Sequence, residues 1–382
     1  MDKNSNDAQN KDKILYVINH IDWFWSHRLP LANGAKQSGL DVHLAVTGAS
    51  KDEKLKNHGF TGHELPDSQK GFMPLTLLKT IRSTSKLIKQ QQPKYIHAIT
   101  LKYAFIAGLA ALPYKNVRVI HTIAGLGYLF SGEGLKPKIL RTAIMPLLKL
   151  ALKNSKTHLI FQNPDDMALM HKRGLSDENR AHLIKGSGVD TSAFKNTPIP
   201  ETENPIILMP TRLVHNKGIA IFIEAAKIAA TQKPHLKFQI AGGITHNNPL
   251  AITESQMKDM LSDSPVEWLG KVSDMPALLE KTSLICYPSY YGEGVPKVLL
   301  EACACARPII TTDHPGCREA VADGQNGLLV PVKNAQKTAQ AILSIIDNKE
   351  TLNAMSKAGR NRAETEFDAA IIVQKTLEVY SK

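Results

Sequence analysis

Short apolar runs alternate with helical patterns along this chain, and one clear break divides the alternation into two arrays. Strands separated by helices favour parallel sheets with helices on both faces. The break falls at residues 194–205, which contain three prolines and no apolar run, and this composition is typical of a linker. The pattern therefore predicts an α/β fold with two Rossmann-like, doubly wound parallel-sheet domains that face a cleft.

The chain has 382 residues, too many for one ordinary hydrophobic core. We expect a disordered lead-in, an N-terminal Rossmann-like domain, a linker, a C-terminal Rossmann-like domain, and a final helix that packs back on the N-terminal domain. Their predicted bounds are residues 1–12, 13–193, 194–205, 206–360 and 361–382. The predicted strands are residues 13–19, 41–46, 95–98, 117–121, 158–162, 182–185, 205–210, 236–241, 266–269, 283–288 and 308–311.

Composition excludes several classes of protein. Hydrophobic residues make up 43% and charged residues 21% of the chain, values typical of a globular protein. The polar start lacks the apolar core of a secretion signal, and the longest apolar run, at 103–114, is shorter than the ~18 residues that span a bilayer. The four cysteines all lie between Cys286 and Cys317, and their spacing fits neither a zinc site nor a disulfide framework. We therefore expect reduced thiols in a cytoplasmic protein.

Positive charge is concentrated in the N-terminal half. Residues 1–190 contain 27 Lys and Arg against 15 Asp and Glu, whereas residues 191–382 contain 20 of each. This asymmetry predicts an anionic partner for the first half: a membrane surface, a phosphorylated lipid or a nucleic acid.

Two cations lie in the turn that follows the predicted strand at 205–210. Arg212 and Lys217 occur in the segment RLVHNKG, directly before a predicted helix at 218–231. A helix N-terminus also favours anions, so this turn suits a diphosphate whose negative charge grows as it leaves. Two solvated surface charges are the structural alternative.

Two carboxylates follow the predicted strand at 283–288. Glu293 lies in the loop YYGEGVP, and Glu301 lies inside the predicted helix at 296–305. The glycines of this loop allow the backbone to approach a ligand closely. Glu293 and Glu301 can therefore contact different parts of one ligand, although a capping acid and a surface acid would give the same pattern.

Together these segments resemble glycosyltransferase family 4. Glu293 and Glu301 match the E-x7-E pattern of its retaining members with the GT-B fold, and Arg212 and Lys217 match the preceding R-x4-K cations. The resemblance extends from about residue 13 to the end of the chain and is most specific at 288–324. The chain is similar to the bacterial enzymes that extend sugars linked to undecaprenyl diphosphate, including those that transfer N-acetylgalactosamine to lipid-linked diacetylbacillosamine. Residues 125–130 (GLGYLF) and 186–190 (GSGVD) match other segments of that subgroup.

The resemblance implies roles for individual residues. Arg212 and Lys217 would bind the donor diphosphate, Glu293 would contact donor-sugar hydroxyls, and Glu301 would contact the ribose. The remaining donor-binding candidates are Gly242, Gly243, Gly294 and Val295. The implied reaction is retaining transfer of a hexose or N-acetylhexosamine from a UDP-sugar, used as co-substrate, to a polyprenyl-diphosphate-linked sugar in surface glycan or glycoprotein oligosaccharide assembly.

The sequence departs from the family pattern in two places. His215 and Asn216 stand where relatives often have an aromatic residue and an Asp, and residues 20–27 (HIDWFWSH) replace a glycine-rich loop after the first strand. His121, which we expect at a strand end, is either the family's histidine near the reaction centre or a structural residue. No D-x-D motif occurs to hold a divalent cation, so we expect neither a metal nor another cofactor.

A basic, apolar stretch at 135–156 predicts contact with the inner face of the membrane, which would make the protein cytoplasmic and peripherally bound. A second basic stretch lies at 77–94. Ordinary core helices with solvated lysines are the alternative. Two other functions stay open: a nucleotide-sugar epimerase, because the same scaffold supports both reactions, and a basic nucleic-acid-binding protein, although no nucleic-acid motif is present. The candidates for acceptor and membrane contact are Lys136, Lys138, Arg141 and Lys149.

Overall fold

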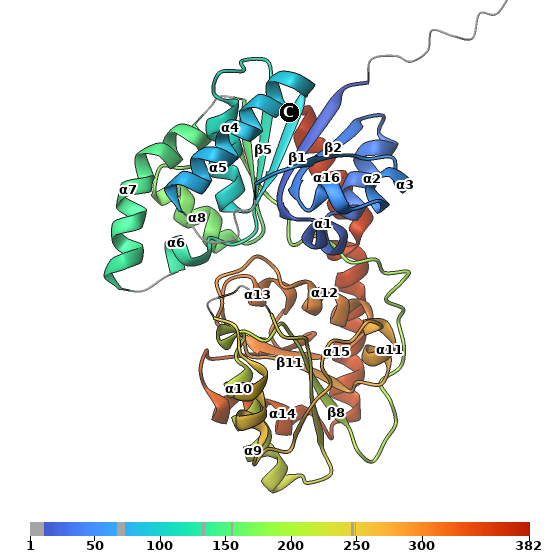
Figure 1. Cartoon of the computed structure of the whole chain (residues 1–382). Helices are drawn as coiled ribbons and strands as arrows, with labels where there is room; N and C mark the ends of the chain where they lie inside the picture. Colours follow the sequence, from blue (N-terminus) through green and yellow to red (C-terminus); the bar gives the residue numbers. More distant parts are fainter. Residues whose placement is uncertain (1–10, 67–72, 132–133, 154–155, 246–247, 249) are drawn as a thin grey trace, which may run out of the picture. The chain divides into compact units, whose positions relative to one another are not determined.

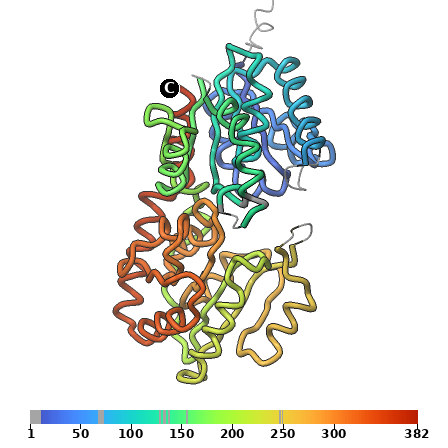
Figure 2. Tube along the Cα trace, turned by 90° about the vertical axis from the view of Figure 1, so that its left-hand side faces the viewer, coloured from blue at the N-terminus to red at the C-terminus, as the bar shows by residue number. Residues whose placement is uncertain are grey.

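The computed structural model describes residues 11–66, 73–131, 134–153, 156–245, 248 and 250–382. Most of the lead-in predicted at 1–12 therefore lies outside the described residues. The chain divides into two compact units. Unit 1 runs up to Ile184 and includes Ile372–Lys382, and unit 2 is Lys185–Ile371. The segment predicted as a linker, 194–205, thus belongs to unit 2, and most of the final helix belongs to unit 1, as Figure 2 lets the reader follow along the trace.

Unit 1 contains one parallel sheet, with seven strands among the described residues, in the order β3-β2-β1-β4-β5-β6-β7. The order reverses between β1 and β4, as in doubly wound folds. Its central strands are continuous apolar runs, which parallel strands need because helices cover both of their faces. The strands are β1 (Lys13–His20), β2 (Asp41–Thr47), β3 (Thr61–Glu64), β4 (Tyr95–Ile99), β5 (Arg118–Ile123), β6 (Thr157–Phe161) and β7 (Ala181–Leu183).

Two hydrophobic clusters cover the two faces of this sheet (Figure 1). Alternate residues of β1 separate them: Leu15 and Val17 pack with α4, α5 and α7, whereas Tyr16 and Ile18 pack with α1, α2 and α16. The helices are α1 (Ile21–His27), α2 (Leu29–Gln37), α3 (Lys54–Asn57), α4 (Pro74–Gln91), α5 (Leu101–Ala111), α6 (Gly127–Ser131), α7 (Leu135–Leu152), α8 (Pro164–Lys172) and α16 (Ala369–Ser381). Among the described residues, no helix has both the length and the apolar character needed to cross a bilayer.

A buried polar network attaches the last helix to unit 1. The Tyr380 hydroxyl lies 2.7 Å from His97 Nδ1 and 3.2 Å from the Tyr16 hydroxyl, and His97 Nε2 lies 2.7 Å from Thr122 Oγ1. Arg118 donates to the carbonyl oxygen of Tyr380 at 2.5 Å. These bonds satisfy polar groups inside the core, where an unpaired group would be costly.

Unit 2 repeats the design with a parallel sheet in the order β10-β9-β8-β11-β12-β13. Here the order reverses between β8 and β11, which are hydrogen-bonded neighbours. The strands are β8 (Ile206–Pro210), β9 (Lys237–Ala241), β10 (Val266–Trp268), β11 (Leu284–Tyr287), β12 (Ile309–Thr312) and β13 (Gly327–Val330). The helices are α9 (Ile219–Gln232), α10 (Glu254–Leu261), α11 (Met275–Glu280), α12 (Lys297–Ala304), α13 (Cys317–Ala320), α14 (Ala335–Ile345) and α15 (Lys349–Arg362).

Both units confirm the predicted doubly wound parallel sheets, and each predicted strand is present within a few residues. The prediction missed β3, whose polar residues lie at the sheet edge, and the short strand β13. It also treated residues 20–27 as a substitute for a loop, whereas residues 21–27 form α1. Phe24, fully buried, anchors this helix to the core.

Candidate active site

The two charged motifs follow the two strands between which the sheet of unit 2 reverses its order. The loop that contains Arg212 and Lys217 follows β8, and the loop that contains Glu293 follows β11. In open α/β sheets ligands bind outside the carboxyl ends of the strands at such a switch point. The order of the strands therefore brings the two motifs to one edge of one sheet.

Lys217 and Glu293 form an ion pair at this edge. Lys217 is 3% exposed, and its Nζ also donates to the Tyr287 hydroxyl at 2.6 Å. The Tyr287 hydroxyl donates in turn to Glu293 Oε1 at 3.1 Å. The rings of Tyr287 and Tyr291 lie 5.2 and 5.3 Å from the ammonium, close enough for cation–π attraction. A buried cation is thus held in place by an acid, a hydroxyl and two aromatic rings.

Close backbone contact makes this arrangement possible. Gly218, with φ of 84°, packs closely against the loop that follows β11, and an added Cβ would lie 2.1 Å from the Pro288 oxygen. The amide of Tyr290 donates to the carbonyl oxygen of Asn216 at 3.1 Å, and the Tyr290 hydroxyl donates to that of His215 at 3.0 Å. The two loops are therefore joined by backbone contacts on both sides of Lys217.

A second glycine brings α13 onto the acidic loop. Gly316, with φ of 85°, precedes α13, and an added Cβ would lie 2.2 Å from the Gly294 oxygen and 2.6 Å from the Glu293 oxygen. Gly294 and Val295 are buried beside it. The segment at 186–190 packs on the same loop, because a Cβ on Gly186 would lie 3.4 Å from Val295 Cβ. These contacts restrict the position of the backbone that carries Glu293.

Arg212 lies at the same edge but is exposed. Its side chain forms no ion pair with any residue that the structure describes. Burial raises the pKa of Tyr291, whereas the positive charge of Arg212 acts on that pKa in the opposite direction. Arg212 is therefore a cation that is available to an anion from solution.

The glycine pair after β9 approaches this loop from the other side. A Cβ on Gly242 would lie 1.7 Å from the Thr211 oxygen, so only glycine fits next to Arg212. Trp268 donates from Nε1 to the Gly242 oxygen at 2.8 Å, and a Cβ on Gly243 would contact Lys271 at 3.1 Å. Gly242 thus brings the end of β9 against the Arg212 turn.

Glu301 lies inside α12 and is 9% exposed. Its nearest cation is Lys297 on the same helix, with 3.4 Å between Nζ and Oε1. Burial raises the pKa of Glu301, and Lys297 only partly opposes this effect. The role of Glu301 at the ribose stays a prediction. Its carboxyl oxygens can accept hydrogen bonds in addition to the ion pair with Lys297.

His121 does not end its strand, as the sequence had suggested, because β5 continues to Ile123. The side chain is fully buried, burial lowers its pKa to about 3, and neither ring nitrogen has a partner. These observations describe a neutral histidine within the sheet of unit 1. A catalytic role stays a prediction.

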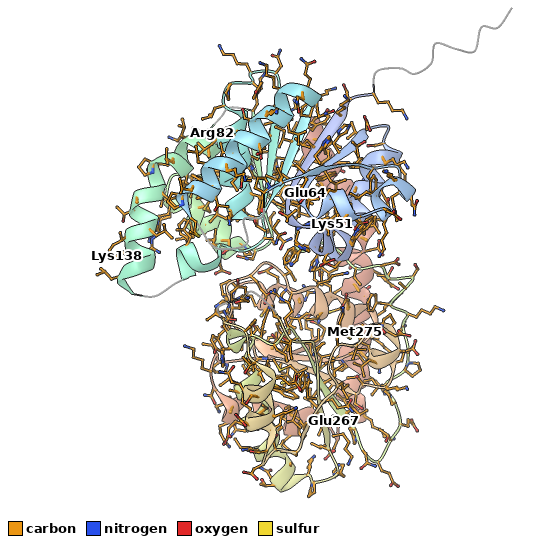
Figure 3. The ribbon with its side chains drawn as sticks, in the orientation of Figure 1. Lys51, Glu64, Arg82, Lys138, Glu267 and Met275 are labelled. Atoms are coloured by element: carbon orange, nitrogen blue, oxygen red, sulfur yellow. The ribbon has the colours of Figure 1, made fainter. Side chains whose placement is uncertain are left out.

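The candidates for acceptor and membrane contact all lie in α7 of unit 1. Lys138 and Lys149 are exposed, and Lys138 lies near the start of the helix at the outer edge of the unit (Figure 3). Arg141 makes long contacts of 3.4 and 3.5 Å to the carbonyl oxygens of Leu129 and Phe130. Lys136 belongs to α7, but its side chain is not among those described.

Sequence reasoning missed Tyr287 and Gly316. The candidates were residues just after strands, whereas Tyr287 is the last residue of β11 and lies inside an apolar run. Gly316 lies within the stretch 288–324 that carries the resemblance, but its contact with the Glu293 backbone depends on tertiary packing. Within the described parts of the chain, no group of three or more His, Cys, Asp or Glu side chains is arranged to hold a metal ion.

Two glycosyltransferase family models match this chain. The family model "Glycosyl transferases group 1" matches residues 190–362, and the model "Glycosyl transferase 4-like" matches residues 13–163. One model matches unit 1 and the other matches unit 2. The chain therefore belongs to the glycosyltransferases with the GT-B fold. Of the functions that the sequence left open, a transferase is therefore the one supported.

Two relatives are similar to this chain along most of their length. One is the N,N'-diacetylbacillosaminyl-diphospho-undecaprenol alpha-1,3-N-acetylgalactosaminyltransferase of Campylobacter jejuni, 29% identical over 374 residues that cover 93% of this chain and 94% of the relative. Another is the UDP-Gal:alpha-D-GlcNAc-diphosphoundecaprenol alpha-1,3-galactosyltransferase of Escherichia coli, 25% identical over 92% of this chain and 94% of the relative. The solved structure of sucrose-phosphate synthase from Thermosynechococcus elongatus superposes with a TM-score of 0.79 at 20% identity, covering 97% and 98% of the two chains. This superposition shows that the fold is shared.

The contact at Gly218 generates a prediction about stability and activity. Gly218→Ala places a Cβ against the Pro288 oxygen and also forces alanine into a left-handed conformation. We expect turnover to fall by about tenfold or more, because Lys217 is displaced. Gly324→Ala is the control, since Gly324 has φ of 74° but no atom within 4 Å of an added Cβ. Gly324→Ala should lower the free energy of unfolding, measured by urea titration, by only ~1–2 kcal/mol. Gly218→Ala should lower it by more, and an equal loss for the two variants would contradict the close contact at Gly218.

The burial of Glu301 generates a prediction about pH. Because its pKa is raised in the folded protein, the native state binds more protons than the unfolded state, and stability falls as the pH rises above the usual carboxyl range. Glu301→Gln should therefore raise the melting temperature at pH 8, and the gain should disappear at pH 4. The exposed Glu203→Gln serves as control. A variant that is less stable than the wild type at pH 8 would show that the ionised carboxylate is stabilising.

Proposed function

We propose that this glycosyltransferase transfers a hexose or N-acetylhexosamine, with retention of configuration, from a UDP-sugar to a polyprenyl-diphosphate-linked sugar. The observation that carries the proposal is the placement of Lys217, Glu293 and Arg212 at the switch point of unit 2. The names of two full-length relatives support the acceptor class, since both act on diphospho-undecaprenol-linked sugars, and one of these names includes a UDP-sugar.

In the proposed reaction the bond between the sugar C1 and the diphosphate oxygen breaks, and its electron pair stays with the departing UDP. The acceptor hydroxyl oxygen forms the new bond to C1 on the same face, and its proton passes to the departing phosphate. Negative charge therefore grows on the diphosphate in the transition state. Fixed cations in a site shielded from water stabilise such charge more than water does, and Lys217 and Arg212 would supply them.

The role proposed for Glu293 is at the donor sugar rather than at the diphosphate. Its carboxylate lies within reach of Lys217, and its loop is restrained by Gly316. We propose that it accepts hydrogen bonds from donor-sugar hydroxyls, while Glu301 accepts them from the ribose. With two side-chain cations in place at the diphosphate, we further propose that transfer requires no metal ion.

The donor proposal is tested by substitution of the cations. UDP- and GDP-sugars are first screened for thermal stabilisation, and the stabilising donor is then assayed with polyprenyl-diphosphate sugars in excess EDTA. Lys217→Ala and Arg212→Ala should each lower turnover by roughly 10²–10³-fold, the cost of losing one charge-stabilising group. The exposed Lys281→Ala is the matched control. Normal turnover of the Lys217 variant, or loss of activity in EDTA, would overturn the corresponding part of the proposal.

We also propose that unit 1 binds the inner face of the cell membrane through α7. One side of this helix packs into the core through Leu148, Ala151 and Leu152. The other side exposes Leu135 and Ile139, which are 71% and 60% exposed. Leu147 and Leu150 extend the apolar stripe, at 47% and 51%, and Lys138 and Lys149 are exposed beside it. An apolar stripe flanked by lysines suits the interface of an anionic bilayer.

Vesicle flotation tests the membrane proposal. The wild type should bind phosphatidylglycerol vesicles at low salt and be released by high salt, since each nearby cation contributes ~1 kcal/mol of electrostatic attraction. Ile139→Glu combined with Leu150→Glu should reduce binding by about tenfold or more, because both side chains leave the apolar interface. Leu183→Glu, at an exposed leucine 41% accessible in β7, controls for an added charge elsewhere on unit 1. Absence of wild-type flotation at low salt would contradict the proposal.

A further inference from the structure

The two groups assigned to different parts of the donor form an ion pair with each other. Lys217 Nζ is paired with Glu293, whose side chain is 18% exposed. A bound diphosphate needs the Lys217 charge, and the donor sugar needs the Glu293 oxygens. A diphosphate that takes up the Lys217 charge competes with Glu293 for that ammonium, and an exchange in which the diphosphate replaces Glu293 would release the carboxylate to the donor sugar.

The Tyr287 hydroxyl is the partner that can remain during this exchange. Tyr287 ends β11, and its side chain is 2% exposed, so it is held by the sheet rather than by the loop that carries Glu293. Its backbone carbonyl oxygen accepts a hydrogen bond from Thr311 Oγ1 of the neighbouring strand at 2.7 Å. Glu293, in contrast, lies on a loop between glycines. The rigid hydroxyl and the loop carboxylate thus contact the same ammonium from different elements.

Hydrogen-bond geometry determines from which group the Tyr287 hydroxyl accepts and to which group it donates. An ammonium has three donors and no acceptor, so the Tyr287 oxygen must accept from Lys217 and its single proton points to Glu293. Burial raises the pKa of Tyr287 well above its usual value, which keeps that proton in place. When Glu293 leaves, the hydroxyl still accepts from Lys217, and its proton becomes available to the incoming anion.

We propose that Tyr287 is a positioning residue of the transfer reaction: its hydroxyl keeps the Lys217 ammonium at the diphosphate position while Glu293 moves from Lys217 to the donor sugar. The inference rests on the proposed function and adds a residue and a step to it. The structural alternative is that Tyr287 is a core aromatic residue whose hydroxyl has no effect on Lys217.

The first test is a double-mutant cycle. Tyr287→Phe keeps the ring, so the core and the cation–π contact persist, and only the hydroxyl is lost. We expect kcat to fall by about ten- to a hundredfold, the scale expected for a misplaced charge-stabilising group, with little change in melting temperature. Tyr114→Phe is the control, since it removes a tyrosine hydroxyl that donates to the Ser85 carbonyl oxygen in unit 1, and it should change kcat by less than about twofold.

In a Lys217→Ala background, Tyr287→Phe should cause no further loss of kcat, because residues that act through one another are not additive. An additive loss, or equal activity of the two Tyr→Phe variants, would overturn the inference. These outcomes are distinct from failure of the proposed function, which would appear as normal turnover of Lys217→Ala alone.

The second test examines the exchange directly and does not depend on the folding of a Tyr287 variant. UDP is used as the probe in calorimetric titrations of Glu293→Gln. Without the carboxylate as a competitor for Lys217, UDP should bind several-fold more tightly than it binds the wild type. Glu203→Gln, which removes an exposed acid that the site does not use, should leave the UDP affinity unchanged. Weaker binding of UDP to Glu293→Gln would overturn the exchange, and absence of binding to the wild type would instead contradict the UDP donor.

Discussion

A buried ammonium is the constraint on which the candidate site depends. Lys217 is almost inaccessible to water, so its charge must be balanced by groups that the fold supplies. Glu293, the Tyr287 hydroxyl and two aromatic rings provide that balance. Each comes from the β11 strand or the loop after it, whereas Lys217 comes from the loop after β8. The site therefore exists only where those two loops meet.

Glycine residues make that meeting possible. Gly218, Gly242 and Gly316 each lie where an added Cβ would come within about 2 Å of a backbone oxygen on another segment. Two of them also have positive φ, which other residues adopt only with strain. The charged side chains are thus positioned by glycines, which have no side chain. This arrangement gives the site a rigid backbone frame, with the Glu293 side chain as the part able to exchange partners.

The two units use the same sheet design for different surfaces. In unit 2 the reversal of strand order gathers charged loops. In unit 1 the first strand is followed by α1, anchored by Phe24, and a buried network around Tyr380 attaches the final helix. The outer face of α7 exposes leucines and lysines that the core does not require. Basic charge in the first half of the chain therefore lies on a surface that is open to an anionic partner.

Much of the fold could be predicted from patterns along the chain, and the misses have physical causes. Continuous apolar runs such as β1 identify central parallel strands, because both faces of these strands are buried. The edge strand β3 lacks that signal because it is polar and mostly exposed. Arg212, Lys217 and Glu293 could be proposed from their positions after strands. The prediction that His121 ends a strand was wrong by two residues, because the run continues to Ile123.

Local sequence alone was enough to define the alternating elements, the family to which the chain belongs and the charged residues of the donor motifs, because each depends on neighbours within a few residues. Tertiary structure was needed to show that Tyr287 contacts Lys217, separated by 70 positions, and that Gly316 supports the Glu293 backbone. Those contacts result from the order in which strands pair and from how closely two backbones can approach. Both are properties of the folded sheet, and neither leaves a periodic signal in the chain.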